Sequence, residues 1–255
     1  SNDYIAISPW AQKVSKGTSP SDSPEITKTV KLAAGGHTLY LLRHNATVYA
    51  VGSNEDGVLG NGSSDALART PIQVNRGQTL EEEEGLSYIA DIAAGNAHAL
   101  ALSYNHNLYG WGRNAEGQLG ALATGTAAVN APALVRENVY QMKGGEDGTL
   151  VYALYTDGEM TEYPTLLGYG INVNGELGNG GIINANGTPV NGAGTVNEMN
   201  SKYMQEVWSF SVGKNHSVMS YRDGSVFATG VNAWGQLGEY THEDSVIPVR
   251  VGPQP

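Results

Sequence analysis

The segment Asn114-Ala115-Glu116-Gly117-Gln118-Leu119-Gly120 identifies the fold of this chain, because its pattern occurs four times. The pattern is Asn-x-x-Gly-x-Leu-Gly, and the other copies end at Gly60, Gly178 and Gly238. The final glycines of successive copies are 60, 58 and 60 residues apart. A nearly constant period of this length indicates one structural unit that is repeated along the chain.

Each copy of the pattern is flanked by further shared features. A glycine and a nearby histidine precede three copies, and these histidines are His37, His98 and His216. A proline follows each copy by 10 to 12 residues. Alternating apolar runs such as 98–103, and turn pairs such as Asp223-Gly224, predict about four short strands in each unit. Four-stranded units at a fixed period are typical of propeller blades, so we predict an all-β β-propeller.

These units resemble the regulator of chromosome condensation repeat. The resemblance rests on an apolar run ending in Ala-Ala-Gly, a histidine, a hairpin, the Asn-x-x-Gly-x-Leu-Gly turn and Pro-x-x-Val. It covers residues about 28 to 251. It implies a rigid propeller that presents loops to protein partners, and familiar members of the family close as seven blades.

The repeat divides the chain into an N-terminal segment and four predicted blades. The segment 1–27 could be a closing strand or the tail of a preceding repeat. The blades are predicted at residues 28–76, 77–136, 137–194 and 195–255, the third being degenerate. Four blades could form a small ring, be part of a longer propeller, or complete a ring with another chain.

Composition excludes several classes of function. The chain has 255 residues, a formal net charge of −11 and no cysteine, which excludes disulfides, thiolate metal sites and cysteine catalysis. It has no cluster of Lys and Arg, so we expect no nucleic-acid partner. It has no apolar run of membrane-spanning length, so we expect no membrane insertion. An acidic chain rich in Asn, Gly and Thr favours an extracellular or cell-surface protein of a bacterium, with the cytoplasm as the alternative.

The repeated polar residues have a structural interpretation. Three histidines could bind zinc, but their position in the repeat predicts that a ring nitrogen instead hydrogen-bonds a turn. The repeated asparagine is expected to bond its own backbone two residues on, and the glycine to supply a positive φ. The chain also has no Gly-x-Ser-x-Gly, phosphate-binding loop or His-Glu-x-x-His motif. We therefore predict a non-enzymatic protein with no catalytic residue, metal or cofactor.

Residues that break the repeat are the better functional candidates. Trp234 occupies the turn position that Asp56, Glu116 and Asn174 fill in the other units. A large aromatic side chain on an exposed turn suggests an anchor for a partner, whereas the alternative is packing against a neighbouring loop. Tyr163 lies in an insertion of the third unit, and insertions in repeats map to loops. We therefore predict that Trp234, Tyr163, Glu116 and Asp56 contact a partner.

The sequence favours a non-catalytic module for protein–protein interaction, which presents its loops on a rigid propeller. Its partner would be an unidentified protein or a neighbouring subunit. One alternative is a structural or self-assembling component of an extracellular surface. Another is a carbohydrate-binding propeller, in which exposed Trp and Tyr side chains would stack on sugars.

Overall fold

The computed structural model of the protein describes most of its repeated units. The described residues are 27–77, 85–120, 127–145, 148–153, 165–170, 172, 174–178 and 207–252. They form antiparallel sheets and one short 3-10 helix, η1 (Glu55–Gly57). Within these ranges, no helix has the length and hydrophobicity needed to cross a membrane. Tyr163 and nearly all of the N-terminal segment lie outside the described residues.

The described strands form four sheets, in each of which sequential strands are neighbours. The first sheet contains β1 (Thr29–Gly35), β2 (Thr38–Arg43), β3 (Val48–Ser53) and β4 (Leu67–Gln73). The second contains β5 (Ile89–Ala94), β6 (His98–Ser103), β7 (Leu108–Gly112) and β8 (Val129–Arg136). The third contains β9 (Val139–Gly144), β10 (Gly148–Ala153) and β11 (Thr165–Gly170). The fourth contains β12 (Val207–Val212), β13 (His216–Tyr221), β14 (Val226–Gly230) and β15 (Ser245–Arg250).

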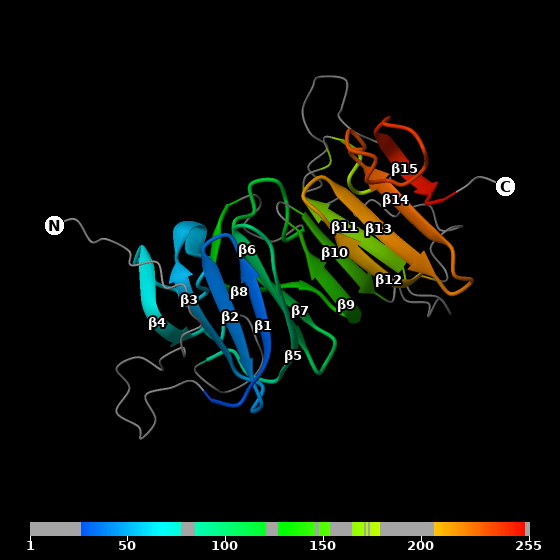
Figure 1. Cartoon of the computed structure of the whole chain (residues 1–255). Helices are drawn as coiled ribbons and strands as arrows, with labels where there is room; N and C mark the ends of the chain where they lie inside the picture. Colours follow the sequence, from blue (N-terminus) through cyan, green and yellow to red (C-terminus); the bar gives the residue numbers. More distant parts are fainter. Residues whose placement is uncertain are drawn as a thin grey trace.

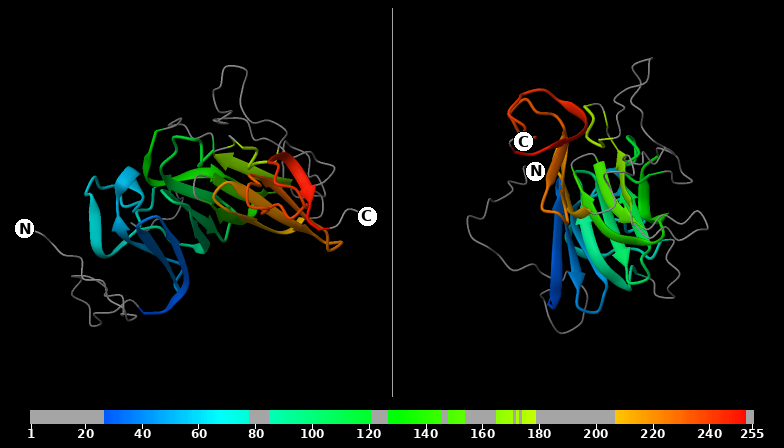
Figure 2. Two further views of the ribbon diagram at one scale, coloured as in Figure 1. Left: turned by 45° about the horizontal axis from the view of Figure 1, so that its top comes forward. Right: turned by 90° about the vertical axis from the view of Figure 1, so that its right-hand side faces the viewer.

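The four sheets follow one another along an arc, with the first and fourth at its two ends (Figures 1 and 2). The first strands of successive sheets contact one another, so that β1 meets β5, β5 meets β9 and β9 meets β12. Each sheet therefore turns its first strand toward the inside of the arc and its last strand outward. This radial arrangement of antiparallel sheets confirms the predicted all-β propeller fold.

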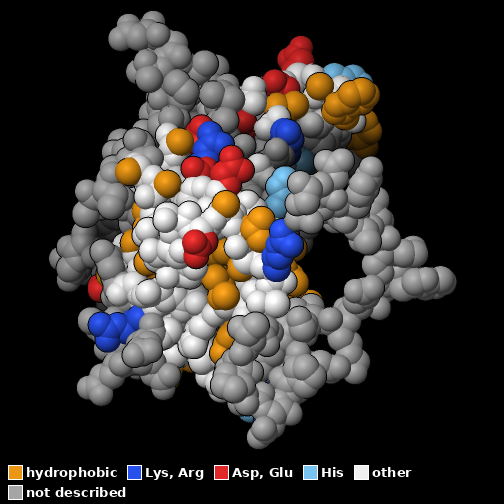
Figure 3. Space-filling view, turned by 90° about the vertical axis from the view of Figure 1, so that its left-hand side faces the viewer, with side chains coloured by type: hydrophobic (Ala, Val, Ile, Leu, Met, Phe, Trp, Pro, Cys, Tyr) orange, Lys and Arg blue, Asp and Glu red, His pale blue; other side chains and the backbone are white. Residues whose placement is uncertain are grey.

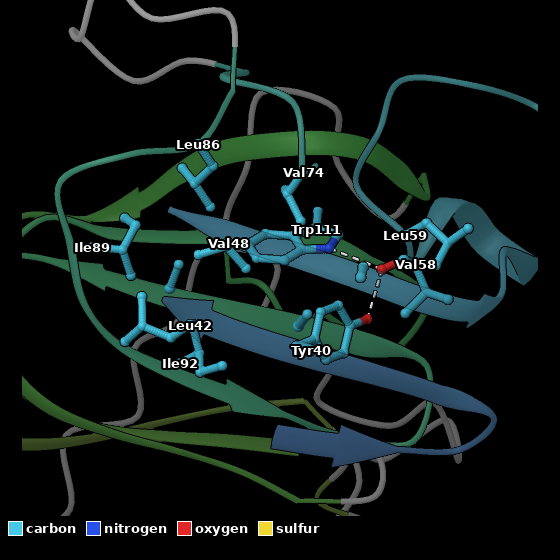
Figure 4. Close-up of a cluster of buried hydrophobic side chains, with 13 residues drawn as sticks. Tyr40, Leu42, Val48, Val58, Leu59, Val74, Leu86, Ile89, Ile92 and Trp111 are labelled. Atoms are coloured by element: carbon cyan, nitrogen blue, oxygen red, sulfur yellow. Dashed lines mark hydrogen bonds between the residues drawn. The ribbon is translucent and has the colours of Figure 1, made fainter. Parts of the chain in front are cut away.

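Apolar cores lie at the junctions between successive sheets. At the first junction, the carbonyl oxygen of Val58 accepts hydrogen bonds from Tyr40 Oη (2.6 Å) and Trp111 Nε1 (2.9 Å) (Figure 4). The two rings meet edge to face, with centroids 5.9 Å apart. Tyr40 and Val58 belong to the first unit and Trp111 to the second, so this contact joins two sheets. Leu59 and Ile92 pack in the same core.

The Asn-x-x-Gly-x-Leu-Gly turn is held by one hydrogen bond that recurs in all four units. The Oδ1 atom of the asparagine accepts from the backbone N–H of the leucine five residues later. The four distances are 2.8 or 2.9 Å, for the pairs Asn54–Leu59, Asn114–Leu119, Asn172–Leu177 and Asn232–Leu237. The prediction that the asparagine bonds the backbone two residues on is therefore wrong. The turn folds back far enough to bring the leucine N–H to the side-chain amide oxygen of the asparagine. The positive φ expected of the first glycine is confirmed, for example 77° at Gly117.

Two of the repeated histidines pack into the scaffold, whereas the expected hydrogen bond from a ring nitrogen to a turn stays a prediction. The imidazole of His98 is fully buried against Gly95, where a Cβ atom would lie 2.0 Å from His98 Cε1. Gly213 makes the same room for His216. His37 is exposed, because Thr38 occupies the equivalent place at the start of β2. The expectation that all three histidines share one position is therefore wrong by one residue for His37.

We predict that Asn114→Ala lowers the free energy of unfolding by about 1–3 kcal/mol, because the buried N–H of Leu119 loses its acceptor. Chemical denaturation monitored by tryptophan fluorescence measures this loss. Asn130→Ala is the matched control, because the Asn130 side chain is exposed on β8. We expect the control to change stability by less than about 0.5 kcal/mol. Equal losses in the two variants would show that the turn does not depend on the Asn114 amide.

We predict that the protein loses stability in mild acid because of His98. Burial lowers the pKa of His98 from 6.5 to about 4, so the folded state keeps the imidazole neutral. Between pH 6.5 and about pH 4, His98 is protonated in the unfolded chain and neutral in the folded chain. Lowering the pH from 7 to 5 should therefore cost the protein about 2 kcal/mol from this group.

The test compares urea denaturation at pH 7 and pH 5 for the unmodified chain and for His98→Gln. Glutamine does not titrate, so the variant should lose less stability over this interval, even if it is less stable at pH 7. An identical pH dependence in the two proteins would contradict the assignment to His98.

Candidate partner-binding site

The Asn-x-x-Gly-x-Leu-Gly turns lie at the same end of equivalent sheets. In the first, second and fourth sheets this turn lies in the connection between the third and fourth strands, for example between β7 and β8. Because the sheets stand side by side in the arc, these turns border one face of the propeller. The residue in the middle of the turn varies between units. In the first, second and fourth units it is Asp56, Glu116 and Trp234.

A second hydrogen bond determines how this middle residue is presented. The backbone N–H of Glu116, Asn174 or Trp234 donates to the side-chain oxygen of the residue two positions later, at 3.1, 2.9 and 2.9 Å. The acceptors are Gln118, Glu176 and Gln236. This bond fixes the backbone of the middle residue from within the turn. Its side chain is then free to differ between units without changing the turn.

The polar candidates differ in how available their side chains are. Glu116 forms an ion pair with Arg113 Nη2 at 2.8 Å and accepts from Gln118 Nε2 at 3.3 Å. Its carboxylate is therefore partly engaged within its own turn. Asp56 is exposed in η1, where it adopts a φ of 57°. Both residues lie on the turn face, but the described structure does not bring either of them into contact with Trp234.

Trp234 is the most exposed large hydrophobic residue of the described part of the chain, with 90% of its surface accessible. The alternative that it packs against a neighbouring loop is inconsistent with this exposure. Two residues earlier, the amide Nδ2 of the buried Asn232 donates to Glu239 Oε1 (3.2 Å) and to the carbonyl of Thr241 (3.0 Å). The backbone N–H of Asn232 also donates to Asp244 Oδ1 at 2.7 Å. These bonds hold the segment 239–244 beside the turn.

That segment adds two exposed rings to the site, which the sequence reasoning did not select. Tyr240 is 79% exposed and has a φ of 69°, and His242 lies beside Gly235 of the turn. We call Trp234, Tyr240 and His242 the aromatic loop patch. Comparison between units could have found Tyr240, because none of the residues two places after the other Leu-Gly glycines is aromatic. These residues are Gly62, Leu122 and Gly180.

The surroundings of the aromatic loop patch are acidic. The segment 231–244 contains Glu239, Glu243 and Asp244 and has no Lys or Arg. Figure 3 shows hydrophobic side chains beside His and Asp or Glu side chains at the upper right edge of that view. An apolar anchor surrounded by carboxylates suits a partner segment that offers Lys or Arg beside an apolar surface.

The described residues show no arrangement of three or more His, Asp or Glu side chains suited to holding a metal ion. The imidazoles of His98 and His216 are packed in different sheets, and each lies against its own glycine. Their geometry serves the scaffold, so the surface rather than a buried centre offers the candidate site.

Comparison with known proteins matches this fold and its repeat. Models of the regulator of chromosome condensation (RCC1) repeat match residues 45–102 and 89–118. The probable E3 ubiquitin-protein ligase HERC6 of Homo sapiens is 30% identical over 213 residues, which cover 83% of this chain and 18% of the ligase. The ultraviolet-B receptor UVR8 of Arabidopsis thaliana is 27% identical over 217 residues, which cover 83% of this chain and 43% of the receptor. The chain thus spans less than half the length of these relatives.

Solved structures show the same architecture. Human WBSCR16 aligns with a TM-score of 0.67 and 22% identity, over 90% of this chain and 55% of that protein. Prp20p of Saccharomyces cerevisiae aligns with a TM-score of 0.67 and 22% identity, over 89% of this chain and 51% of that protein. The repeat models and the four recurring turns show that the chain is built from regulator of chromosome condensation repeats, and these solved structures share its propeller fold.

Proposed function

We propose that this chain is a non-catalytic protein-binding module, and that the aromatic loop patch is its contact site. The observation that carries the proposal is the 90% exposure of Trp234 at a turn position that is polar in the other three units. Exposing an indole to water has a cost in free energy, and tryptophan and tyrosine dominate the energetics of many protein interfaces. The backbone of the turn is already fixed by the bond from Trp234 N–H to Gln236, so binding needs to order only the side chain.

Structural relatives support a role in protein binding. Prp20p was described together with its binding to Gsp1p and histones, and yeast RCC1 (Prp20) was solved bound to Kap60. The relatives that are ligases extend far beyond the matched region, because the alignment covers only 18% of HERC6. We therefore transfer to this chain the general role of protein binding, and neither the partners nor the ligase activity of those proteins.

The charge of the site suggests the chemistry of the partner. Glu243 is exposed beside the aromatic loop patch, and Glu239 and Asp244 are close to it. The chain as a whole has a formal net charge of −11. A partner segment with Lys or Arg next to an apolar side chain would pair its charge with these carboxylates and its apolar part with Trp234. Such a complex should weaken as the salt concentration rises.

We predict that Trp234→Ala weakens binding to a matching basic peptide by at least about 30-fold, as expected when an aromatic anchor is removed. Suitable peptides come from an array that compares basic, neutral and acidic sequences with apolar residues. Isothermal titration calorimetry of the best peptide against the whole chain then measures affinity at two salt concentrations.

Trp208→Ala is the matched control. Trp208 is also a largely exposed tryptophan of the fourth sheet, but it lies on β12 with the guanidinium of Arg222 over its ring, 5.8 Å from the ring centroid. We expect this variant to bind like the unmodified chain. Equal losses in both variants would indicate non-specific adhesion, and no basic peptide binding at all would refute the proposed partner chemistry.

A further inference from the structure

Four exposed rings lie around the hairpin between β6 and β7, at the end of the second sheet opposite its Asn-x-x-Gly-x-Leu-Gly turn. They are Tyr88 just before β5, Tyr104 and His106 in the hairpin, and Tyr140 on β9. The three tyrosines are 45%, 57% and 44% exposed. We call these four residues the hairpin aromatic surface. They belong to the second and third sheets, each of which has a described sheet on both sides.

The rings form two contacting pairs. Within the second sheet, the rings of Tyr88 and Tyr104 have centroids 5.2 Å apart and planes tilted by 59°. Between the second and third sheets, His106 stacks on Tyr140 with centroids 4.3 Å apart and an interplanar angle of 29°. Backbone bonds support both pairs, because Tyr104 N–H donates to the Tyr88 carbonyl (3.1 Å) and Val139 N–H donates to the His106 carbonyl (2.8 Å). The rings are therefore held in place and remain exposed.

Two of these rings stand at strained positions of the repeat. The residue before the first strand has a positive φ in three units, which is 60° at Lys28, 59° at Tyr88 and 59° at Asn138. Asparagine tolerates this left-handed conformation, whereas a bulky side chain there raises the free energy of the folded state. His106 has a φ of 63° at the hairpin position that Gly224 fills in the fourth unit. Residues better suited to both positions thus occur elsewhere in the chain.

Neither the strain nor the exposure of these rings stabilises the fold. A tyrosine at a left-handed position costs free energy in the backbone, and its exposed ring gains little from burial. Residues that lower stability in this way are characteristic of sites that serve a contact outside the chain. The hairpin aromatic surface is therefore a candidate binding surface, separate from the aromatic loop patch.

The hairpin aromatic surface is uncharged. The segments 85–90 and 103–109 carry three of its four rings and contain no Lys, Arg, Asp or Glu. The charged residues nearest to Tyr140 along the chain are Glu137 and Lys143, which have opposite signs. The polar groups are tyrosine hydroxyls and amides such as that of the exposed Asn105. Such a surface suits an uncharged ligand that offers apolar groups and hydrogen-bond acceptors.

The topology of the sheet excludes one common way of binding a peptide. The strand order is β5-β6-β7-β8, so both strands of the hairpin already have neighbours on both sides. A peptide cannot be added here as a further strand, and recognition has to use rings and side-chain donors. A polyproline II segment meets this requirement. Its proline rings pack on aromatic rings, and its carbonyl oxygens make no internal hydrogen bonds and can accept from side chains.

We propose that the hairpin aromatic surface binds an uncharged, proline-rich segment of a protein partner in the polyproline II conformation. Every third residue of such a segment lies on the same side, so its apolar groups recur along the surface and can meet both ring pairs. A peptide is favoured over a neutral sugar because the rings stand in contacting pairs and not as single flat platforms. The inference rests on the proposed role of the chain in protein binding, and it adds a second surface at the opposite end of the sheets.

An array of uncharged peptides with the pattern Pro-x-x-Pro, each paired with a version that has alanine in place of proline, tests the whole chain. Isothermal titration calorimetry of the best peptide measures affinity, and we expect Tyr88→Asn to weaken binding by at least about 10-fold. The variant should keep or raise the free energy of unfolding, because Asn138 adopts the same backbone conformation in the third unit. A clear loss of stability would show that Tyr88 serves the fold and would contradict the proposal.

Lys28→Asn is the matched control, because it introduces the same residue at the same position of the first unit, where φ is 60°. It should bind the peptide like the unmodified chain. Equal weakening by both substitutions, or equal binding of the proline and alanine peptides, would overturn the proposal. Binding of a neutral oligosaccharide such as maltohexaose that is lost in Tyr88→Asn, with no binding of any peptide, would overturn it as well.

The basic peptide that tests the aromatic loop patch separates this inference from the proposed function. If the basic peptide binds and no proline-rich peptide does, the assignment of the hairpin aromatic surface alone is wrong. If neither binds, the proposed role in protein binding fails with it. Binding of a proline-rich peptide that depends on Tyr88 supports this inference, whatever the result with the basic peptide.

Discussion

The hydrogen bond from the leucine N–H to the asparagine Oδ1 underlies the whole architecture. It closes each Asn-x-x-Gly-x-Leu-Gly turn and brings the leucine side chain to the junction, as it does for Asn114 and Leu119. In the first unit, the closed turn also aims the Val58 carbonyl at Tyr40 and Trp111 of two different sheets. One local bond thus positions groups that hold neighbouring sheets together.

In the described residues the main contacts between sheets join neighbours in the arc, so the arc behaves as a one-dimensional array of junctions. The apolar cores lie between sheets rather than inside any one of them. Among the described residues, no sheet packs on the face of β1 that carries Leu32, and this residue is 60% exposed.

The same repetition separates scaffold from function. A turn whose backbone is fixed by a bond such as that from Trp234 N–H to Gln236 can change its middle residue without cost to the fold. The chain uses this freedom in the fourth unit, where Trp234 and Tyr240 occupy positions that hold no aromatic residue in the other units.

The blade pattern, the positive φ of turn glycines such as Gly117, and the exposure of Trp234 on its turn can all be predicted from the sequence alone, because they follow from local chemistry repeated at a fixed period. Two features depend on how the chain folds back, which residue spacing does not reveal. They are the bond from the leucine N–H to the asparagine five residues earlier and the position of His37 one residue before the buried histidine position. The exposure of Leu32 is a property of the tertiary structure. Its equivalents Ile92 and Phe210 are buried by a preceding sheet, and no sheet of the described residues packs against Leu32.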